Sequence, residues 1–435
     1  ALFTGASIAC GLATSLPVMT LFRACQGIGG GVLMTVSQAI LRESFPAEEQ
    51  GIAMGVYGLG VVLAPAFGPT LGGWLTDHYS WPWIFFINVP IGVVNLVLVD
   101  RFIEDPPYLV REAGAMDLPG LAFLMAGLGA LQLMLEEGQR ENWFESGFIL
   151  RLAVVAAVGL VLFVRRELRT PRPAVDLRIL RNPSFGSATA LIGVLGLALN
   201  GSLFLLPLFL QNLMGFDAMQ TGIIMIPRSL AMALLMPIGG RFYNRLGPRL
   251  LVGSGLLVAS FGFWQLSHLT TQVGAWDLFW PQLWQGVGFA LIFVALSTAA
   301  LSTIPKPQMT QATGLYNVVR QVMGSVGIAV AATQLTSTTA RDHAYLAERV
   351  DVTDHAAVDF LQTTTGAMLR RGTDVAEAGA KARTLLDLRI LRQAMVLAYN
   401  HLFWLVASLF LLALPMVWLL RHGTVAEGEV EILLE

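Results

Sequence analysis

The feature that most constrains the fold of this chain is a series of apolar runs, each near 20 residues long, that recur along the sequence. A run of that length crosses the hydrocarbon core of a bilayer as a helix, because a helix satisfies its backbone hydrogen bonds internally. Charged residues make up only 13% of the chain, against about 25% in soluble domains. The sequence therefore predicts an all-α, polytopic membrane protein.

The apolar runs predict twelve spans, roughly at 1–14, 17–41, 51–76, 82–100, 117–135, 148–165, 184–211, 218–240, 248–268, 277–303, 310–335 and 396–420. The first run is too short to cross a bilayer by itself. It has no basic region and no cleavage site, so it does not match a signal peptide. We expect it to be the tail of a span that begins before residue 1, in a chain that is truncated at its N-terminus.

Basic residues are concentrated in alternate loops between the predicted spans. The basic loops hold Arg42, Arg101, Arg111, six arginines over 165–181, Arg241, Arg245, Arg249, Lys306 and Arg421. The other short loops hold only Arg140. Because Lys and Arg are enriched in cytoplasmic loops, we expect the basic loops and the C-terminus to be cytoplasmic. The long polar segment 336–395 then lies on the outer side, and it contains two stretches that predict amphipathic helices.

The sequence contains an internal repeat at a shift of 259 residues. The shift aligns identical residues without a gap, among them Gln26/Gln285, Gly27/Gly286, Gly29/Gly288, Pro46/Pro305, Gly55/Gly314 and Tyr57/Tyr316. Both copies run in the same direction across the membrane, as in transporters whose halves are related by an axis along the membrane normal. At this shift, the counterparts of spans 184–211 and 218–240 fall before residue 1. We therefore expect an intact set of fourteen spans, of which twelve are present and the first is partial.

The repeat and the spans predict two six-helix bundles plus two extra linker helices. The predicted parts are an N-terminal bundle lacking its first two helices (1–104), two linker helices with a basic cytoplasmic loop (105–183), five helices of the C-terminal bundle (184–335), an extracytoplasmic loop (336–395), and the last helix with a cytoplasmic tail (396–435).

Two stretches of the first half carry a family pattern. GLGVVLAPAFGPTLGGW contains Gly68, Pro69, Gly72 and Gly73, and WPWIFFINVPIG follows it. These stretches resemble the antiporter signature and a neighbouring motif of the major facilitator superfamily, in its fourteen-span drug:proton antiporter type, the EmrB/QacA group. Pro82 stands where the second motif usually has Arg.

Two further motifs agree with this resemblance. LFRACQGIGGG resembles the fourth-span motif, at Arg23, Gln26 and Gly27. GGRFYNRLGPR resembles the second copy of a conserved cytoplasmic loop, and its matching residues are Gly240, Arg245, Gly247 and Arg249. Asn244 stands where the family prefers Asp, which weakens the prediction of a charge-based gate in this copy.

The antiporter motif has two interpretations that are compatible with each other. Its glycines, together with those earlier in the span, let neighbouring membrane helices approach closely. Pro65 and Pro69 each remove a backbone hydrogen bond and bend a helix. A bent span could close one end of a central pathway as two bundles rock against each other.

Three arginines lie inside predicted spans, and each is a candidate pathway or switch residue. Arg228 and Arg320 lie near mid-depth, where a charge costs at least ~2.5 kcal/mol and therefore faces a cavity or a partner. Arg23 lies closer to an end, so its side chain could instead extend to the interface. Asn317 is a fourth candidate, although an interhelical hydrogen bond is the simpler role for an amide in a span. No acidic residue lies at mid-depth, so we expect the coupling acid in a span before residue 1.

The resemblance implies a secondary active exporter of amphipathic drug-like compounds, driven by proton antiport through alternating access. No ATP-binding motif is present, which favours a proton gradient as the energy source, without a cofactor. An exporter of an endogenous metabolite or anionic lipid-like compound is the alternative, because three buried arginines would suit an anion. A non-transporting membrane sensor or scaffold is the alternative of another class.

Other functions are disfavoured by the residues themselves. A membrane-embedded enzyme needs clustered acids, histidines or a Ser/His pair at membrane depth, and the spans show none. Cys10 and Cys25 lie in apolar runs and predict no disulfide framework or metal site. A net charge of −2 gives no indication of nucleic-acid binding. The expected location is the bacterial inner membrane, and by resemblance 336–395 could bind a periplasmic adaptor.

Overall fold

The computed structural model describes residues 1–420, apart from 47, 104–116, 171–172, 174, 306–307 and 351–354. Three basic residues used in the orientation prediction, Arg111, Arg172 and Lys306, lie outside the described residues, and so do all residues after 420. So does the Pro69 side chain.

The described residues form helices and no strands. The helices are α1 (Leu2–Gly11), α2 (Leu16–Ser44), α3 (Gln50–His78), α4 (Trp83–Phe86), α5 (Asn88–Phe102), α6 (Leu118–Glu137), α7 (Gly147–Arg169), α8 (Pro183–Leu208), α9 (Ala218–Leu266), α10 (Ala275–Ser302), α11 (Met309–Arg349), α12 (His355–Arg370) and α13 (Val375–Ala413). This confirms the predicted all-α fold. A π-helical turn, Phe209–Leu213, extends α8.

Ten helical segments in the described part of the chain are long and apolar enough to cross a membrane. Their bounds lie within a few residues of the predicted spans at every position except the two that flank 336–395. α1 has ten residues and is shorter than a span. α3 has 29 residues, which corresponds to roughly 43 Å of helix at 1.5 Å per residue.

Two predicted spans are joined end to end in α9. Gly247 interrupts the helical backbone there with φ 75° and ψ 165°, a left-handed conformation that glycine adopts without the strain of a Cβ. The two candidate spans are Met219–Tyr243 and Arg245–Leu266, and the kink lies at the start of the second span. The loop predicted between 240 and 248 is therefore a single tight turn.

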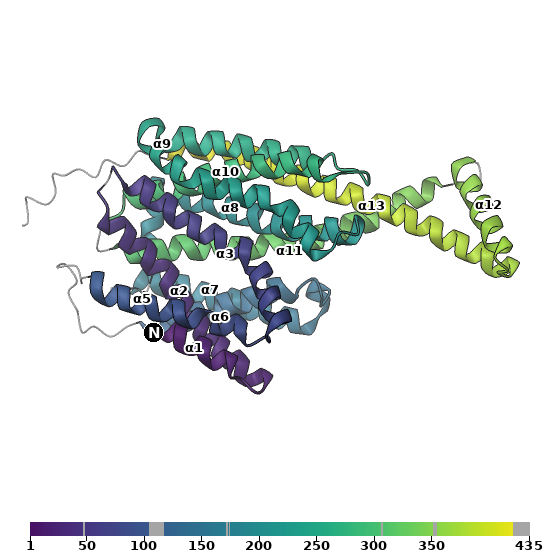
Figure 1. Ribbon diagram of the computed structural model, residues 1–435. Coiled ribbons are helices and arrows are strands. Elements are labelled where there is room, and N and C mark those ends of the chain that lie inside the picture. The colour runs from purple at the N-terminus through teal and green to yellow at the C-terminus, as the bar shows by residue number, and fades with distance from the viewer. Residues whose placement is uncertain are drawn as a thin grey trace, which may run out of the picture.

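Figure 1 shows the helices arranged in two groups. The C-terminal group contains α8, α9, α10, α11 and α13, which enclose a large apolar core. Helix α10 is its central element, because 89% of its most apolar stretch is buried in the protein. The N-terminal group contains α1, α2, α4 and α5, and α3 lies between it and α9 and α10. Helices α6 and α7 pair with each other, and α6 contacts α11.

The segment 336–395, predicted as a loop, is a helical extension of the C-terminal group. Helix α11 continues from its span to Arg349, and α13 begins at Val375, before its own span. The extension also includes α12 and projects from one end of the bundle (Figure 1). His343 of α11 lies 2.9 Å from Asp387 of α13 and joins the two helices. The predicted amphipathic helices exist, but they continue the spans because a helix does not have to end where its hydrophobic stretch ends.

Candidate functional site at the contact between the two helical groups

The N-terminal and C-terminal groups meet through a polar contact between α2 and α11. The Asn317 amide donates to Gln38 Oε1 at 2.8 Å and to the Thr313 carbonyl at 3.0 Å. Gln38 is only 1% exposed. One turn away, a Cβ at Gly314 would lie 3.7 Å from Thr35 Cγ2. Asn317 was a predicted site residue, but its partner Gln38, which is 279 residues away in the chain, was not.

A second contact joins the N-terminal part of α3 to α9. Gly51 and Gly240 approach so closely that a Cβ on either would collide with the backbone of the other. A Cβ at Gly55 would lie 2.5 Å from the Met236 carbonyl oxygen. The glycines here permit backbone-to-backbone packing, as small residues do between membrane helices. Gly240, the first residue of the predicted loop motif, therefore has a packing position between the two groups.

Both contacts lie toward the same end of the spans. Gly51 and Gly240 adjoin the connections at 45–49 and 241–249, and α11 starts at Met309, close to Asn317. These connections belong to the basic set. Gly55 and Gly314, which the repeat aligns, each face the opposite group. The two copies of the repeat thus supply matching positions to the contact.

Arg320 lies on α11, one turn after Asn317 and Tyr316, and Tyr316 is aligned by the repeat with Tyr57. It interacts electrostatically with Tyr57 of α3 and with Tyr316 of α11. Tyr57 donates to the Met34 carbonyl at 3.2 Å, and the Tyr316 hydroxyl lies 3.3 Å from Ser297 Oγ. Arg320 Nε is buried and has no hydrogen-bond partner among the described residues. A cation, two hydroxyls and nearby amides therefore converge where the two groups meet.

Arg228, another candidate pathway residue, lies away from the contact between the two groups. It is 2% exposed and its guanidinium donates to Ser202 Oγ of α8 at 2.9 Å. A Cβ at Gly286 would collide with the Arg228 carbonyl oxygen, so α9 and α10 are closely packed at this depth. Arg228 thus lies inside the C-terminal group rather than at the contact between groups. Its neutral hydroxyl partner was not predicted.

Arg23, Gln26 and Gly27 belong to the N-terminal group. The Arg23 guanidinium donates to Gln26 Oε1 at 2.9 Å and lies 5.6 Å from the centroid of the Phe85 ring. Gln26 in turn donates to Ser7 Oγ of α1 at 2.7 Å, which is the interhelical bond expected for an amide in a span. A Cβ at Gly27 would meet nothing within 4 Å. The repeat partner Gln285 is fully buried, and neither of its side-chain polar atoms has a partner among the described residues.

The antiporter motif lies in the second half of α3, away from the contact. The backbone remains helical from Gln50 to His78, through the positions of both prolines. A Cβ at Gly68, Gly72 or Gly73 would meet nothing within 4 Å. Close packing is thus found at the start of α3 and not at the motif itself. The proposed role of the motif in closing a pathway stays a prediction.

The remaining loop-motif residues lie at the kink of α9. Gly247 provides the left-handed backbone conformation, and Pro248 follows it. Arg249 donates from Nε to the Leu420 carbonyl at 2.7 Å, which ties the turn to the end of the last span. Arg245 is exposed. The motif here builds a turn and anchors it.

An ion pair that the sequence analysis missed joins α6 to α7. Asp117, just before α6, accepts hydrogen bonds from Arg166 Nε at 2.7 and 2.9 Å and from the Gly120 N–H at 3.2 Å. Burial raises the pKa of the Asp117 carboxyl, but the hydrogen bonds from Arg166 and Gly120 and the Arg166 charge lower it, and the net pKa is below the ordinary value. Asp117 and Arg166 are 49 residues apart in the chain, so no local sequence pattern predicted that they pair.

Three polar bonds connect the linker helices to α11, the helix that carries Asn317 and Arg320. Gln132 donates to Ser325 Oγ at 2.7 Å. Trp143 donates to Thr333 Oγ1 at 2.9 Å, and Gln139 donates to Thr336 Oγ1 at 3.2 Å. These bonds fix α6 and the following turn along α11. Among the described residues, no group of His, Cys, Asp and Glu side chains is arranged to hold a metal ion.

The geometry defines a class of protein: a multi-pass helical membrane protein whose two helical groups, related by a sequence repeat, meet at one end through glycines and amides. A family model described as Major Facilitator Superfamily matches residues 1–328. The chain belongs to the major facilitator superfamily, a family of membrane transporters.

Two relatives cover most of the chain. The fatty acid resistance protein FarB of Neisseria gonorrhoeae is 33% identical over 423 residues, which are 96% of this chain and 81% of FarB. The multidrug export protein EmrB of Escherichia coli (strain K12) is 33% identical over 427 residues, 98% of this chain and 82% of EmrB.

A solved structure supports the fold. The human organic anion transporter MFSD10 superposes with a TM-score of 0.57 at 16% identity, over 94% of this chain and 74% of MFSD10. At this identity the likeness concerns the arrangement of helices alone.

Proposed function

We propose that this protein is a secondary active exporter of amphipathic, drug-like compounds that exchanges them for protons by alternating access. The observation that carries the proposal is the contact between the two helical groups, where Asn317, Gln38, Arg320 and two tyrosines gather beside a glycine seam. Polar and charged side chains are costly at membrane depth and mark substrate or ion pathways in transporters.

The proposed mechanism uses two bundles that rock about a site near mid-depth. With the basic loops assigned to the cytoplasm by the positive-inside rule, the contact at Gly51, Gly240 and Asn317 closes the cytoplasmic end. The form described here is then the one closed at the cytoplasmic end. In the opposite form, these glycine and amide contacts separate and the outer ends approach.

The substrate class is proposed from the relatives and from the chemistry of the site. EmrB is named a multidrug export protein, and the aromatic and amide groups near Arg320 suit amphipathic compounds. We place the protein in the fourteen-span drug:proton antiporter type of the superfamily, in a bacterial inner membrane with the C-terminus in the cytoplasm. The helical extension over 336–395 is proposed as the surface for a periplasmic adaptor.

A second candidate substrate class is an anionic lipid-like compound. Arg320 beside the contact favours it, since a half-buried arginine whose Nε lacks a hydrogen-bond partner among the described residues could bind a carboxylate. The name of FarB, a fatty acid resistance protein, agrees with this candidate.

The test uses inverted membrane vesicles that carry the full-length protein. We expect an imposed pH gradient, acidic inside, to drive accumulation of the cation ethidium, and a protonophore to abolish it. Accumulation of decanoate instead of ethidium would favour the second candidate. Flux that ignores the pH gradient would refute proton antiport, and the absence of flux for every compound would favour the sensor or scaffold.

A further inference from the structure

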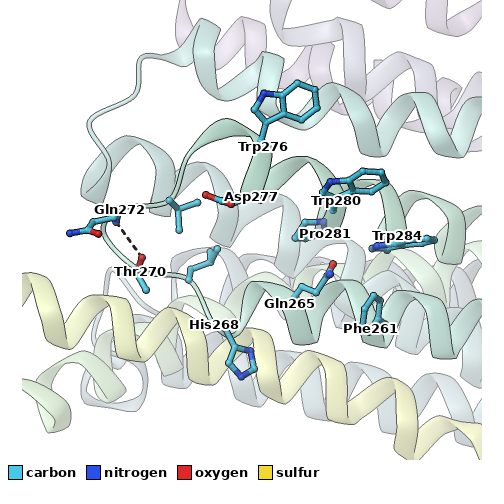
Figure 2. A pocket seen from close by; sticks show the side chains of 12 residues that line it. Phe261, Gln265, His268, Thr270, Gln272, Trp276, Asp277, Trp280, Pro281 and Trp284 are labelled. Atoms are coloured by element: carbon cyan, nitrogen blue, oxygen red, sulfur yellow. Dashed lines mark hydrogen bonds between the residues drawn. The ribbon is translucent and has the colours of Figure 1, made fainter.

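A pocket of about 690 Å³ lies between the ends of α9 and α10 that are joined by residues 267–274. Figure 2 shows the side chains that line it. All of them come from α9, α10 and their connection, and none from the N-terminal group. The volume is within the range of about 300–1,000 Å³ that small-molecule sites occupy. This pocket is therefore separate from the contact that carries the proposed transport pathway.

One wall of the pocket is aromatic. Trp280 and Trp284 are stacked along α10, with ring centroids 6.4 Å apart and an interplanar angle of 27°. Phe261 of α9 meets Trp284 edge to face, with centroids 6.1 Å apart. Trp280 is 51% exposed, so part of this wall is accessible. Tryptophan faces attract cations, and quaternary ammonium groups are recognised in this way by aromatic side chains.

The polar groups of the pocket favour a cation over an anion. Asp277 lines it and accepts the Gly274 N–H at 2.8 Å through Oδ2, which leaves its carboxylate further acceptor capacity. Gln265 Oε1 is buried at the pocket and has no hydrogen-bond partner among the described residues. The described residues around the pocket include one carboxylate and neither Lys nor Arg.

An apolar track leads from the pocket along α9. Phe261 is 44% exposed, and Leu257, one turn closer to the middle of the span, is 51% exposed. Residues four apart lie on the same face of a helix. An alkyl chain could therefore follow this face toward the bilayer centre while its head group remains at the pocket, at the level where tryptophans collect in membrane proteins.

We propose that this pocket binds the ammonium head group of an amphiphile. The Trp280 and Trp284 rings and the Asp277 carboxylate contact the cation, Gln265 Oε1 accepts from a donor on the head group where one is present, and the tail lies along Phe261 and Leu257. Two sources supply this chemistry, an aminophospholipid of the bilayer and a free cationic amphiphile.

The experiment measures binding of radiolabelled decyltrimethylammonium to the full-length protein in nanodiscs of phosphatidylglycerol, a lipid without an ammonium group. Protein-free nanodiscs give the background. We expect Asp277→Asn and Trp280→Leu each to weaken binding about tenfold. Asparagine keeps the acceptor for the Gly274 N–H, so the start of α10 stays capped.

Two matched variants control for general effects. Asp217→Asn removes a carboxylate that caps α9, where Asp217 accepts from the Gln220 N–H at 2.7 Å. Trp404→Leu removes a tryptophan that is 58% exposed and lies outside the pocket. We expect both to change binding less than twofold. Repeating the wild-type measurement in phosphatidylethanolamine separates the sources: lost label binding identifies the lipid as occupant, and retained binding identifies the free amphiphile.

Two results would overturn the proposal. One is equal binding by the wild type, Asp277→Asn and Trp280→Leu, which would mean that the probe only partitions into the bilayer. The other is displacement of the label by decyl sulfate as effectively as by unlabelled decyltrimethylammonium, which requires no variant and would show an apolar groove without head-group selectivity. Because transport is not measured, the result does not depend on the proposed export activity.

Discussion

Two arginines inside the spans, Arg23 and Arg228, bond to neutral groups. Arg228 bonds to the Ser202 hydroxyl, and Arg23 bonds to an amide and faces an aromatic ring. Hydroxyl and amide oxygens accept hydrogen bonds from the guanidinium, and aromatic rings attract its charge. None of these groups adds a second charge that must be desolvated.

The glycines at the contact between the two helical groups allow α3 and α9 to pack backbone against backbone. A Cβ at Gly55 would lie 2.5 Å from a backbone oxygen of α9, whereas a Cβ at Gly60 of the same helix would meet nothing within 4 Å. We expect Gly55→Ala to lower the efflux rate at least tenfold, because the groups can no longer close at this end. Gly60→Ala should keep the rate within twofold, and its helix should gain up to ~1 kcal/mol from alanine. Vesicle transport and thermal unfolding of both variants check this. Equal rates for the two would contradict the role of the contact.

At the scale of elements, an ion pair joins the linker helices α6 and α7, and side-chain hydrogen bonds attach α6 and the following turn to α11. The Asp117–Arg166 pair joins the two helices near the end of each span, where Arg166 is 39% exposed through its side chain and Asp117 only 3%. The partners on α11 of α6 and the following turn are hydroxyls. The linker helices are therefore a packed part of the bundle and not a loose tether.

The Asp117 carboxyl makes this pairing depend on pH. Its folded pKa is below the ordinary value, so the ion pair stabilises the fold above the unfolded pKa, near 4. That stabilisation is lost as pH falls through the folded pKa. We expect Asp117→Asn to lower the unfolding temperature at pH 7, and the difference from the wild type to shrink below pH 4. Thermal unfolding of both proteins in detergent across this range measures it. A difference that persists unchanged at pH 3 would rule out the charge as its cause.

The bond between Gln132 and Ser325 tests the docking of α6 on α11. Interhelical hydrogen bonds of this kind contribute about 0.6 kcal/mol on average in membrane proteins, with a maximum near 1.7. We expect Gln132→Leu and Ser325→Ala to couple by about this amount in a double-mutant cycle of unfolding free energies. Strictly additive effects would show that the two side chains contribute independently.

On the scale of the whole molecule, the two helical groups touch at one end through positions that the repeat aligns. Gly55 and Gly314 each face the other group, and Tyr57 and Tyr316 both interact with Arg320. The proposed alternating access requires such matching positions to approach and separate as the two groups move.

A reversible crosslink across the contact tests whether it opens during transport. Thr35 and Gly314 are close enough for a cysteine pair, and the native Cys10 and Cys25 are replaced by alanine first. We expect oxidation of the variant with Thr35→Cys and Gly314→Cys to lower efflux at least tenfold, and reduction to restore it. Each single cysteine variant serves as the control. Full efflux with the crosslink formed would show that these ends need not separate.

Hydropathy located the spans because the membrane requires about 20 apolar residues wherever a helix crosses it. That requirement is local, so the helices lie near their predicted bounds. Hydropathy marks the edge of the membrane and not the end of a helix, which is why α11 and α13 extend through 336–395 beyond the predicted limits. The sequence also predicted that Arg228 and Arg320 lie inside spans, because a charged side chain is rare near mid-depth.

Two levels of organisation can therefore be separated in this protein. The sequence by itself determined the all-helical membrane fold, the positions of the spans and the repeat, because these depend on runs and spacings that neighbouring residues define. Only the tertiary structure decided which groups meet: Gln38 with Asn317, Arg320 with Tyr57, Asp117 with Arg166. Such partners lie far apart in the chain, and their contact depends on how whole helices pack. The same dependence explains why Gln26 has partners while its repeat counterpart Gln285 has none among the described residues.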